Sequence, residues 1–130
     1  MRHMKNETAN TQAILKFYRV FYNEKRFGEG AMLLAENFIN HHPGVAGQGR
    51  QGMIDDFGRH ARDIFPDFHI EAKRMVAEGA FVWTHSLITG LPQGAGAVSV
   101  DIWRFENGAI AEHWDVAQGL KPDQNPASMF

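Results

Sequence analysis

The stretch 101-DIWRFENGAIAEHWDVAQ-118 contains two alternating segments that flank an Asn-Gly pair. Alternation of apolar and polar residues predicts two half-buried strands, and Asn-Gly is a strong signal for the turn of a hairpin. One alternating set in the second strand is Ala111, His113, Asp115 and Ala117. The second strand therefore points a histidine and an aspartate toward the same side of a sheet, between small residues.

The length of the turn decides which side chains of the first strand join them. A two-residue Asn-Gly turn pairs Asp101 with Trp114, which puts Asp101 and His113 on opposite faces. A three-residue loop, with Gly108 in the left-handed conformation, pairs Asp101 with His113 instead. The residues on one face are then Asp101, Trp103, His113 and Asp115. Because a shift of one residue reverses every side chain, the local sequence leaves both registers open.

Helical patterns precede the hairpin. An apolar stripe with spacing i, i+3, i+4, i+7 and i+8 predicts a helix over residues 8–25. AMLLAE (31–36) predicts a short second helix, and a third contains Met53 and ends before Pro66. Residues 38–52 are rich in glycine, which favours a short strand and a loop.

After the helices, the hydrophobic period changes to two. Strands are predicted at 68–78, 81–89, 98–105 and 109–118. Helices followed by a meander of strands are typical of an α+β domain in which helices cover one face of a curved antiparallel sheet and leave a pocket on it. Residues 1–130 are expected to form a single domain, with flexible ends at 1–7 and 119–130.

The composition excludes several classes of function. The chain has 130 residues, a formal net charge of -2 and no cysteine. The charge gives no electrostatic basis for binding nucleic acid or an anionic membrane. Without cysteine there is no disulfide and no thiolate chemistry. No apolar run is long enough for a membrane span, and no signal peptide is recognised, so a cytoplasmic protein is predicted.

Three stretches carry a family resemblance: INHHPGVAGQG, MVAEGAFVWTHS and VDIWRFENGAIAEHWDVAQ. They resemble the SnoaL-like polyketide cyclases of the nuclear transport factor 2-like superfamily, over residues 8–118. The resemblance implies an α+β cone of three helices on a strongly curved antiparallel or mixed sheet around an apolar cavity, no cofactor, and a homodimer. It also implies that an aspartate on the last strand, here Asp115, is the acid/base of an aldol condensation. It therefore favours Asp101, His113 and Asp115 on one cavity wall.

The sequence is also distantly similar to ketosteroid isomerase. That similarity implies an oxyanion hole made by Tyr18 and by Asp101, kept protonated in an apolar site. The isomerase has an aspartate base directly before a proline, whereas His42 precedes Pro43 in this chain. A histidine therefore replaces the aspartate as the candidate base in this chain. A histidine titrates near neutral pH without any shift of its pKa.

Candidate site residues follow from these patterns. Asp115 is the leading acid/base, since burial between alanines raises the pKa of a carboxylate toward neutrality, and His113 lies beside it. His42 or His85 is an alternative base. His41 and His42 are adjacent in an extended segment and point to opposite sides, so at most one faces a cavity. The predicted substrate-binding residues are Tyr18, His85, Trp103, Trp83 and Phe17. No histidine spacing predicts a metal site.

The predicted function is cofactor-independent acid/base chemistry on a small or medium apolar carbonyl compound, as in an aldol-type cyclase or an isomerase. One alternative is a non-catalytic small-molecule-binding or dimerisation module of the same fold. Another is an epoxide hydrolase-like enzyme, although no Asp-Arg-Asp set is evident. A homodimer is predicted through the outer sheet face, because Ile110, Trp114 and Val116 would form an apolar row away from the pocket.

Overall fold

The computed structural model describes residues 2–130. The helical elements are α1 (Arg2–Phe17), the π-helical turn η1 (Tyr18–Asn23), α2 (Phe27–Gly30), the 3-10 turn η2 (Ala31–Leu33), α3 (Gly49–Asp63) and the 3-10 turn η3 (Pro126–Met129). The strands are β1 (Leu34–Asn40), β2 (His69–Glu78), β3 (Phe81–Thr89), β4 (Ala97–Glu106) and β5 (Ala109–Gly119). Apart from β1, which precedes α3, and the turn η3 at the end, the helical elements come first and the strands afterwards, as the sequence predicts.

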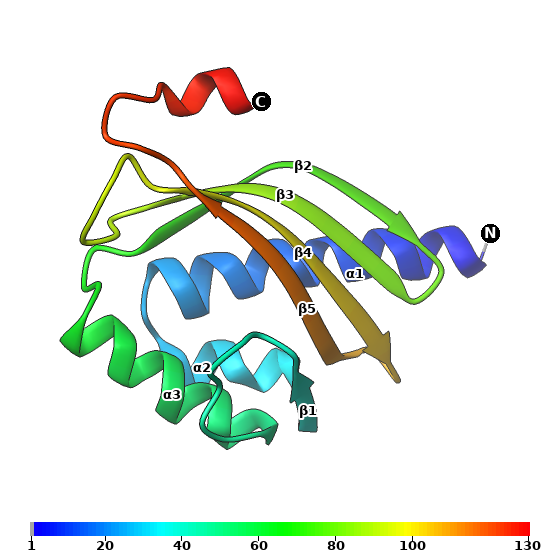
Figure 1. Ribbon diagram of the computed structural model, residues 1–130. Helices are drawn as coiled ribbons and strands as arrows, with labels where there is room; N and C mark the ends of the chain where they lie inside the picture. Colours follow the sequence, from blue (N-terminus) through cyan, green and yellow to red (C-terminus); the bar gives the residue numbers. More distant parts are fainter. Residues whose placement is uncertain (1) are drawn as a thin grey trace.

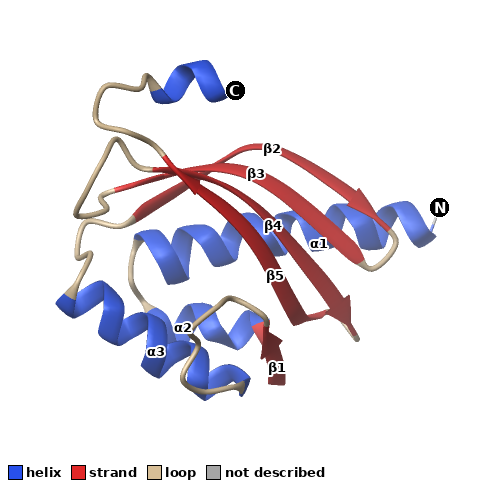
Figure 2. Ribbon diagram, viewed as in Figure 1, coloured by secondary structure: helices blue, strands red, loops and turns tan. Residues whose placement is uncertain are grey.

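The five strands form one mixed sheet in the order β1-β5-β4-β3-β2. Strands β2 to β5 are antiparallel neighbours, and β1 pairs with β5 in parallel. The sheet bends strongly, and α1, α2 and α3 lie on its concave side (Figures 1 and 2). The predicted α+β cone is therefore confirmed. No helix within residues 2–130 is long and apolar enough to cross a membrane.

The helices differ from the sequence prediction at their boundaries. α1 begins at Arg2, before the predicted start at residue 8, and the π-helical turn then continues it to Asn23. The second helix lies earlier than predicted, because Leu34 and the residues after it belong to β1. Leu34 pairs with Ile110 of β5, and this long-range pairing outweighs the local helical preference of AMLLAE. The expected flexibility of residues 1–7 and 119–130 stays a prediction.

The hairpin combines a short turn with a bulge. Asn107 and Gly108 both have positive φ, at 51° and 80°, and form a two-residue turn that pairs Phe105 with Ile110. The register then shifts, and Ala111 is the extra residue on β5. The predicted three-residue loop is wrong.

The bulge nevertheless restores the predicted face. Trp103 pairs with His113, and Asp101 pairs with Asp115, so all four residues share the concave side. The same bulge turns Ile110 inward, where it is fully buried in the core. The outer apolar row predicted from Ile110, Trp114 and Val116 is therefore wrong in its first member.

An aromatic core packs α1 and η1 against the sheet. Phe17 stacks on Phe21 with ring centroids 4.9 Å apart, and its edge meets the Trp103 ring at 5.5 Å. Gly30 allows α2 to approach this core, because a Cβ there would lie 2.6 Å from the Phe21 Cβ. The core residues pack between α1, η1 and the strands, and the cavity described next lies between α3 and the strands.

Candidate active site

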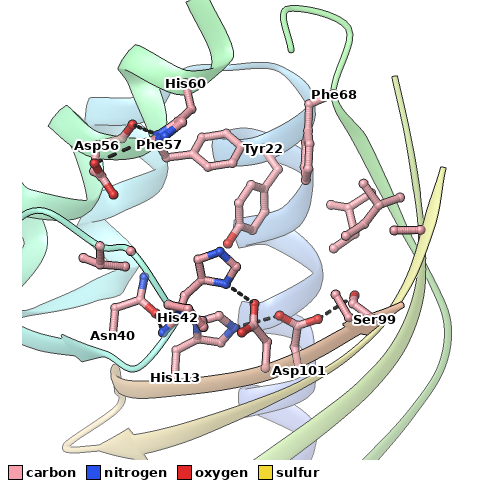
Figure 3. Close-up of a pocket in the computed structure, with 18 of the residues that line it drawn as sticks. Tyr22, Asn40, His42, Asp56, Phe57, His60, Phe68, Ser99, Asp101 and His113 are labelled. Carbon is pink, nitrogen blue, oxygen red and sulfur yellow. Dashed lines mark hydrogen bonds and ion pairs between the residues drawn. The ribbon is translucent and has the colours of Figure 1, made fainter. Parts of the chain in front are cut away.

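A cavity of about 310 Å³ opens between α3, the loop after β1 and the concave face of the sheet. Its apolar walls include Tyr22, Phe57, Phe65, Phe68, Ile70 and Leu91. The polar residues at one end are Asn40, His42, Ser99, Asp101, His113 and Asp115 (Figure 3). An apolar pocket with a few convergent polar groups is the usual form of a small-molecule site. The structure places Asp101, His113 and Asp115 together in the lining of this cavity.

The deeper polar group is a buried aspartate–histidine pair. His113 Nε2 lies 2.7 Å from Asp101 Oδ2, and the two side chains are 4% and 8% exposed. The Ser99 hydroxyl donates to the other Asp101 oxygen at 2.7 Å. The His113 ring stacks on Trp103 with a centroid separation of 3.9 Å. We refer to Asp101 and His113 as the deep pair.

The protonation of the deep pair follows from its neighbours. The side-chain oxygen of Asn40 accepts the backbone N–H of His42 at 3.0 Å, which fixes the orientation of the amide. The same oxygen lies 2.9 Å from His113 Nδ1, so this nitrogen must be the donor. One further proton then lies between His113 Nε2 and Asp101. Both ring nitrogens of His113 and both carboxylate oxygens of Asp101 therefore have hydrogen-bond partners, and we call such a pair closed.

A second aspartate–histidine pair lies at the cavity rim. His42 Nδ1 donates to Asp115 Oδ2 at 2.7 Å, and the side chains are 52% and 13% exposed. Among the described residues, His42 Nε2 has no hydrogen-bond partner, and the ring lines the cavity. We refer to His42 and Asp115 as the rim pair.

The two members of the rim pair shift each other's acidity. The hydrogen bond to Asp115 raises the pKa of His42, although partial burial opposes this. Burial by itself would raise the pKa of Asp115. The hydrogen bond from His42 and the charges of His113 and His42 together outweigh burial and lower the pKa. The expectation that burial makes Asp115 a carboxylate of raised pKa is therefore wrong, and the titrating member of the rim pair is His42.

His41 faces away from the cavity, as expected for the neighbour of His42. Its Nε2 lies 2.7 Å from Glu112 Oε2, and its ring stacks on Trp114 at 5.0 Å. The structure thus selects His42 as the cavity histidine of the two.

The five predicted substrate-binding residues do not line the cavity. Trp83 and His85 point to the outer sheet face, where Trp83 is 50% exposed and His85 contacts Arg74 and Phe130. The inward residues of β3 are the alternate ones, such as Thr84. Phe17 and Trp103 are fully buried core residues. These assignments to the cavity wall are corrected. Strand alternation does not reveal which face of β3 is inward, and an inward direction does not distinguish core residues such as Phe17 and Trp103 from cavity residues.

Tyr18 is the fifth corrected residue. Its hydroxyl lies 2.7 Å from the Thr84 hydroxyl and accepts the Trp103 indole N–H at 3.0 Å. It is a satisfied core tyrosine behind the cavity and is absent from the lining. The oxyanion role that the resemblance to ketosteroid isomerase assigns to Tyr18 therefore lacks a free donor.

Several cavity residues are absent from the sequence prediction. Asn40, in the NHHPG segment, links the deep pair to the loop that carries His42. Ser99 alternates with Asp101 on β4, a signal that was available from the strand pattern. Tyr22 lies on the same helical stripe as Tyr18, and His60 lies on α3 with its Nδ1 on the Asp56 carbonyl at 2.7 Å.

The polar end also contains donor atoms of the kind that bind metals. One ligand atom each from Asp101, His113 and Asp115 lie within 4.8 Å of one another. A metal bound to His113 Nε2 and Asp101 Oδ2 would displace the proton between them. The expectation of a metal-free site stays a prediction.

Comparison with known proteins identifies the family. The model of the SnoaL-like polyketide cyclases matches residues 12–124. The chain belongs to this family. No curated protein matches the sequence.

Solved structures agree with this placement. TsrD from Streptomyces laurentii is 22% identical over 85% of this chain and 89% of its own, with a TM-score of 0.70. A putative polyketide cyclase from Bacillus cereus is 25% identical over 82% of this chain and 72% of its own, with a TM-score of 0.68. A putative ketosteroid isomerase from Kribbella flavida is 18% identical over 96% of this chain and 90% of its own, with a TM-score of 0.70. The chain therefore has the nuclear transport factor 2-like fold of the SnoaL-like family.

Proposed function

We propose that this protein is a cofactor-independent acid/base enzyme that acts on a small or medium apolar carbonyl compound, in an aldol-type cyclisation or an isomerisation. The rim pair carries this proposal, because it places at an apolar cavity an imidazole nitrogen that has no hydrogen-bond partner among the described residues. Family membership and the descriptions of the structural neighbours as cyclases and an isomerase support the same class of chemistry.

In the proposed reaction, neutral His42 removes a proton from the carbon next to the carbonyl. The proton goes to Nε2, and the C–H bonding electrons form the enolate. Asp115 holds the Nδ1–H and stabilises the imidazolium that results. The enolate then either attacks a second carbonyl carbon, which forms a C–C bond, or is protonated at another carbon. His42 gives up its proton to the alkoxide or to that carbon, and the enzyme returns to its starting state.

The deep pair has a positioning role in this scheme. Asp101 orients His113, whose Nδ1–H is donated to Asn40, and Asn40 in turn accepts the backbone N–H of His42. This chain of hydrogen bonds fixes the loop that carries the base. Fixed geometry of this kind is what converts a binding pocket into a catalytic one.

Other predicted functions have less support. An epoxide hydrolase of the Asp-Arg-Asp type needs an arginine beside its carboxylates, and none is among the described residues that line the cavity. A non-catalytic binding module would use the same apolar walls, and it differs from the enzyme in its lack of proton transfer.

We also propose that the chain forms a homodimer through its outer sheet face. Trp83, Val76 and Val116 are large exposed apolar side chains on this face. Val76 and Trp83 are opposite each other in the register of β2 and β3. Clustered apolar residues of this kind mark interaction surfaces.

Proton transfer can be tested without knowledge of the natural substrate. Aromatic methyl ketones of one and two rings, such as 2-acetylnaphthalene, are incubated with the protein in D₂O. Loss of the methyl signal is then followed by proton NMR. The proposal predicts saturable exchange, faster than with the same concentration of free imidazole. A ketone that binds but does not exchange faster would identify a binding module, and a panel in which no ketone binds would contradict the proposal.

A further inference from the structure

Two tyrosines one helical turn apart differ in the use of their hydroxyl groups. Tyr18 and Tyr22 are both buried, with 3% and 7% exposure. The Tyr18 hydroxyl is fully engaged with Thr84 and Trp103. The Tyr22 hydroxyl makes no hydrogen bond to another described residue, and Figure 3 shows it directed toward the polar end of the cavity, beside His42.

A hydroxyl that lines a cavity and has no protein partner is free to bind water or a ligand. Tyr22 lies in the cavity lining, so its free hydroxyl is accessible to a bound molecule. Burial raises its pKa, and the charge of Asp101 raises it further. The phenol therefore stays protonated, and it offers a donor to an oxygen of the ligand.

The position of this hydroxyl is fixed by its surroundings. Tyr22 lies in the π-helical turn η1, and turns of this kind are frequent at functional sites. The next residue, Asn23, is clamped to Ile70, donating to its carbonyl and accepting its N–H, both at 2.9 Å. The Tyr22 ring meets Phe57 edge to face at 4.8 Å. The donor is thus held in place before any ligand arrives.

We infer that the Tyr22 hydroxyl donates a hydrogen bond to the carbonyl oxygen of the ligand. This inference rests on the proposed function in taking the ligand to be a carbonyl compound. With the oxygen on Tyr22, the neighbouring carbon lies on the side of the rim pair, where His42 can take its proton. As the oxygen becomes an enolate, a preorganised donor binds it more strongly, which lowers the barrier.

The test compares two ligands of the same shape. 2-Acetylnaphthalene has a carbonyl oxygen where 2-isopropenylnaphthalene has a CH₂ group, so the ratio of their dissociation constants isolates the oxygen. In Tyr22→Phe the preference for the ketone should fall by about threefold to tenfold, the value of one neutral hydrogen bond. Tyr18→Phe is the matched control and should leave the ratio unchanged, because its hydroxyl contacts only the core. If Tyr22 has only a structural role, Tyr22→Phe should weaken the binding of both ligands equally.

A second measurement uses the wild-type chain, in case Tyr22→Phe does not fold. The sequence contains two tyrosines, so protein with ζ-¹³C-tyrosine gives two signals. Tyr18→Phe assigns them. The ketone should shift the Tyr22 signal beyond the shift caused by the isopropenyl compound. Equal shifts, or an unchanged affinity ratio in Tyr22→Phe, would each overturn the inference, whereas a ketone that does not bind would contradict the proposed function on which the inference rests. Because none of these readouts needs turnover, they are separate from the test of proton exchange.

Discussion

Two aspartate–histidine pairs of the same chemical type meet at the concave face of the sheet, where Asp101 and Asp115 are opposite each other in the register of β4 and β5. In the deep pair, both ring nitrogens of His113 and both oxygens of Asp101 have protein partners. In the rim pair, His42 uses one nitrogen on Asp115, and its other nitrogen has no partner among the described residues; half of the side chain is exposed. The pairs therefore differ in their free hydrogen-bonding capacity rather than in composition.

This difference separates a structural role from a chemical one. A closed pair can accept a substrate proton only if it breaks a buried hydrogen bond, which is costly. An open pair exchanges protons with a ligand or with solvent at no such cost. The sequence predicts Asp115 and His113 as neighbours and does not predict that Asp115 pairs with His42. The surroundings of the two pairs decide between them.

The largest expected effect on stability comes from the deep pair. Asp101→Ala leaves His113 and Ser99 buried without their partner, so it should lower the free energy of unfolding by about 3–5 kcal/mol. Asp115→Ala is the matched change at the rim. It should cost about 1 kcal/mol or less, because water can solvate the exposed His42. Urea unfolding of the two variants measures both values, and equal losses would remove the distinction between the pairs.

The next prediction, of an effect of intermediate size, concerns the pH dependence of the rate of ketone exchange. The base is neutral His42, so the exchange rate should rise as pH increases through the His42 pKa. Asp115 holds that pKa up, chiefly through its hydrogen bond. In Asp115→Asn the His42 pKa falls, and the rising limb of the pH–rate profile should move to lower pH. A limb that moves to higher pH, or does not move, would show that His42 is not the titrating group.

The smallest expected effect on the site comes from the outer face of the same sheet. Trp83→Glu places a charge among exposed apolar side chains and should convert a homodimer to a monomer in sedimentation experiments. Exchange of a bound ketone should change little, because Trp83 is absent from the cavity lining. A wild-type chain that sediments as a monomer at micromolar concentration would contradict the proposed dimer.

Local sequence patterns predict most of the fold. The helical stripe, the proline after α3 and the alternating strands are local signals, and their elements are found near the predicted positions. The second helix is the exception, since β1 is stabilised by pairing with a strand far away in the chain. In the hairpin, the Asn-Gly turn can be predicted from the sequence. The bulge at Ala111, which sets the final register, cannot be predicted from it.

The site is less predictable than the fold. Strand alternation groups His113 with Asp115, and the family resemblance adds Asp101 to them. The adjacency of His41 and His42 in the chain separates these two histidines. Which face of β3 is inward depends on the packing of α1, so Trp83 and His85 were assigned to the wrong side. Tyr18 and Tyr22 share one helical stripe, and only the three-dimensional packing shows which hydroxyl meets the core and which meets the cavity.

The central claim is that His42 of the rim pair carries the proton. It is tested most directly by ketone exchange in D₂O with His42→Gln and His41→Gln, two neighbouring histidines that point to opposite sides. His42→Gln should lower the exchange rate by about 10² to 10⁴, the usual value of general acid–base catalysis, and His41→Gln should leave it within about twofold. Full exchange in folded His42→Gln, or an equal loss in both variants, would contradict the account.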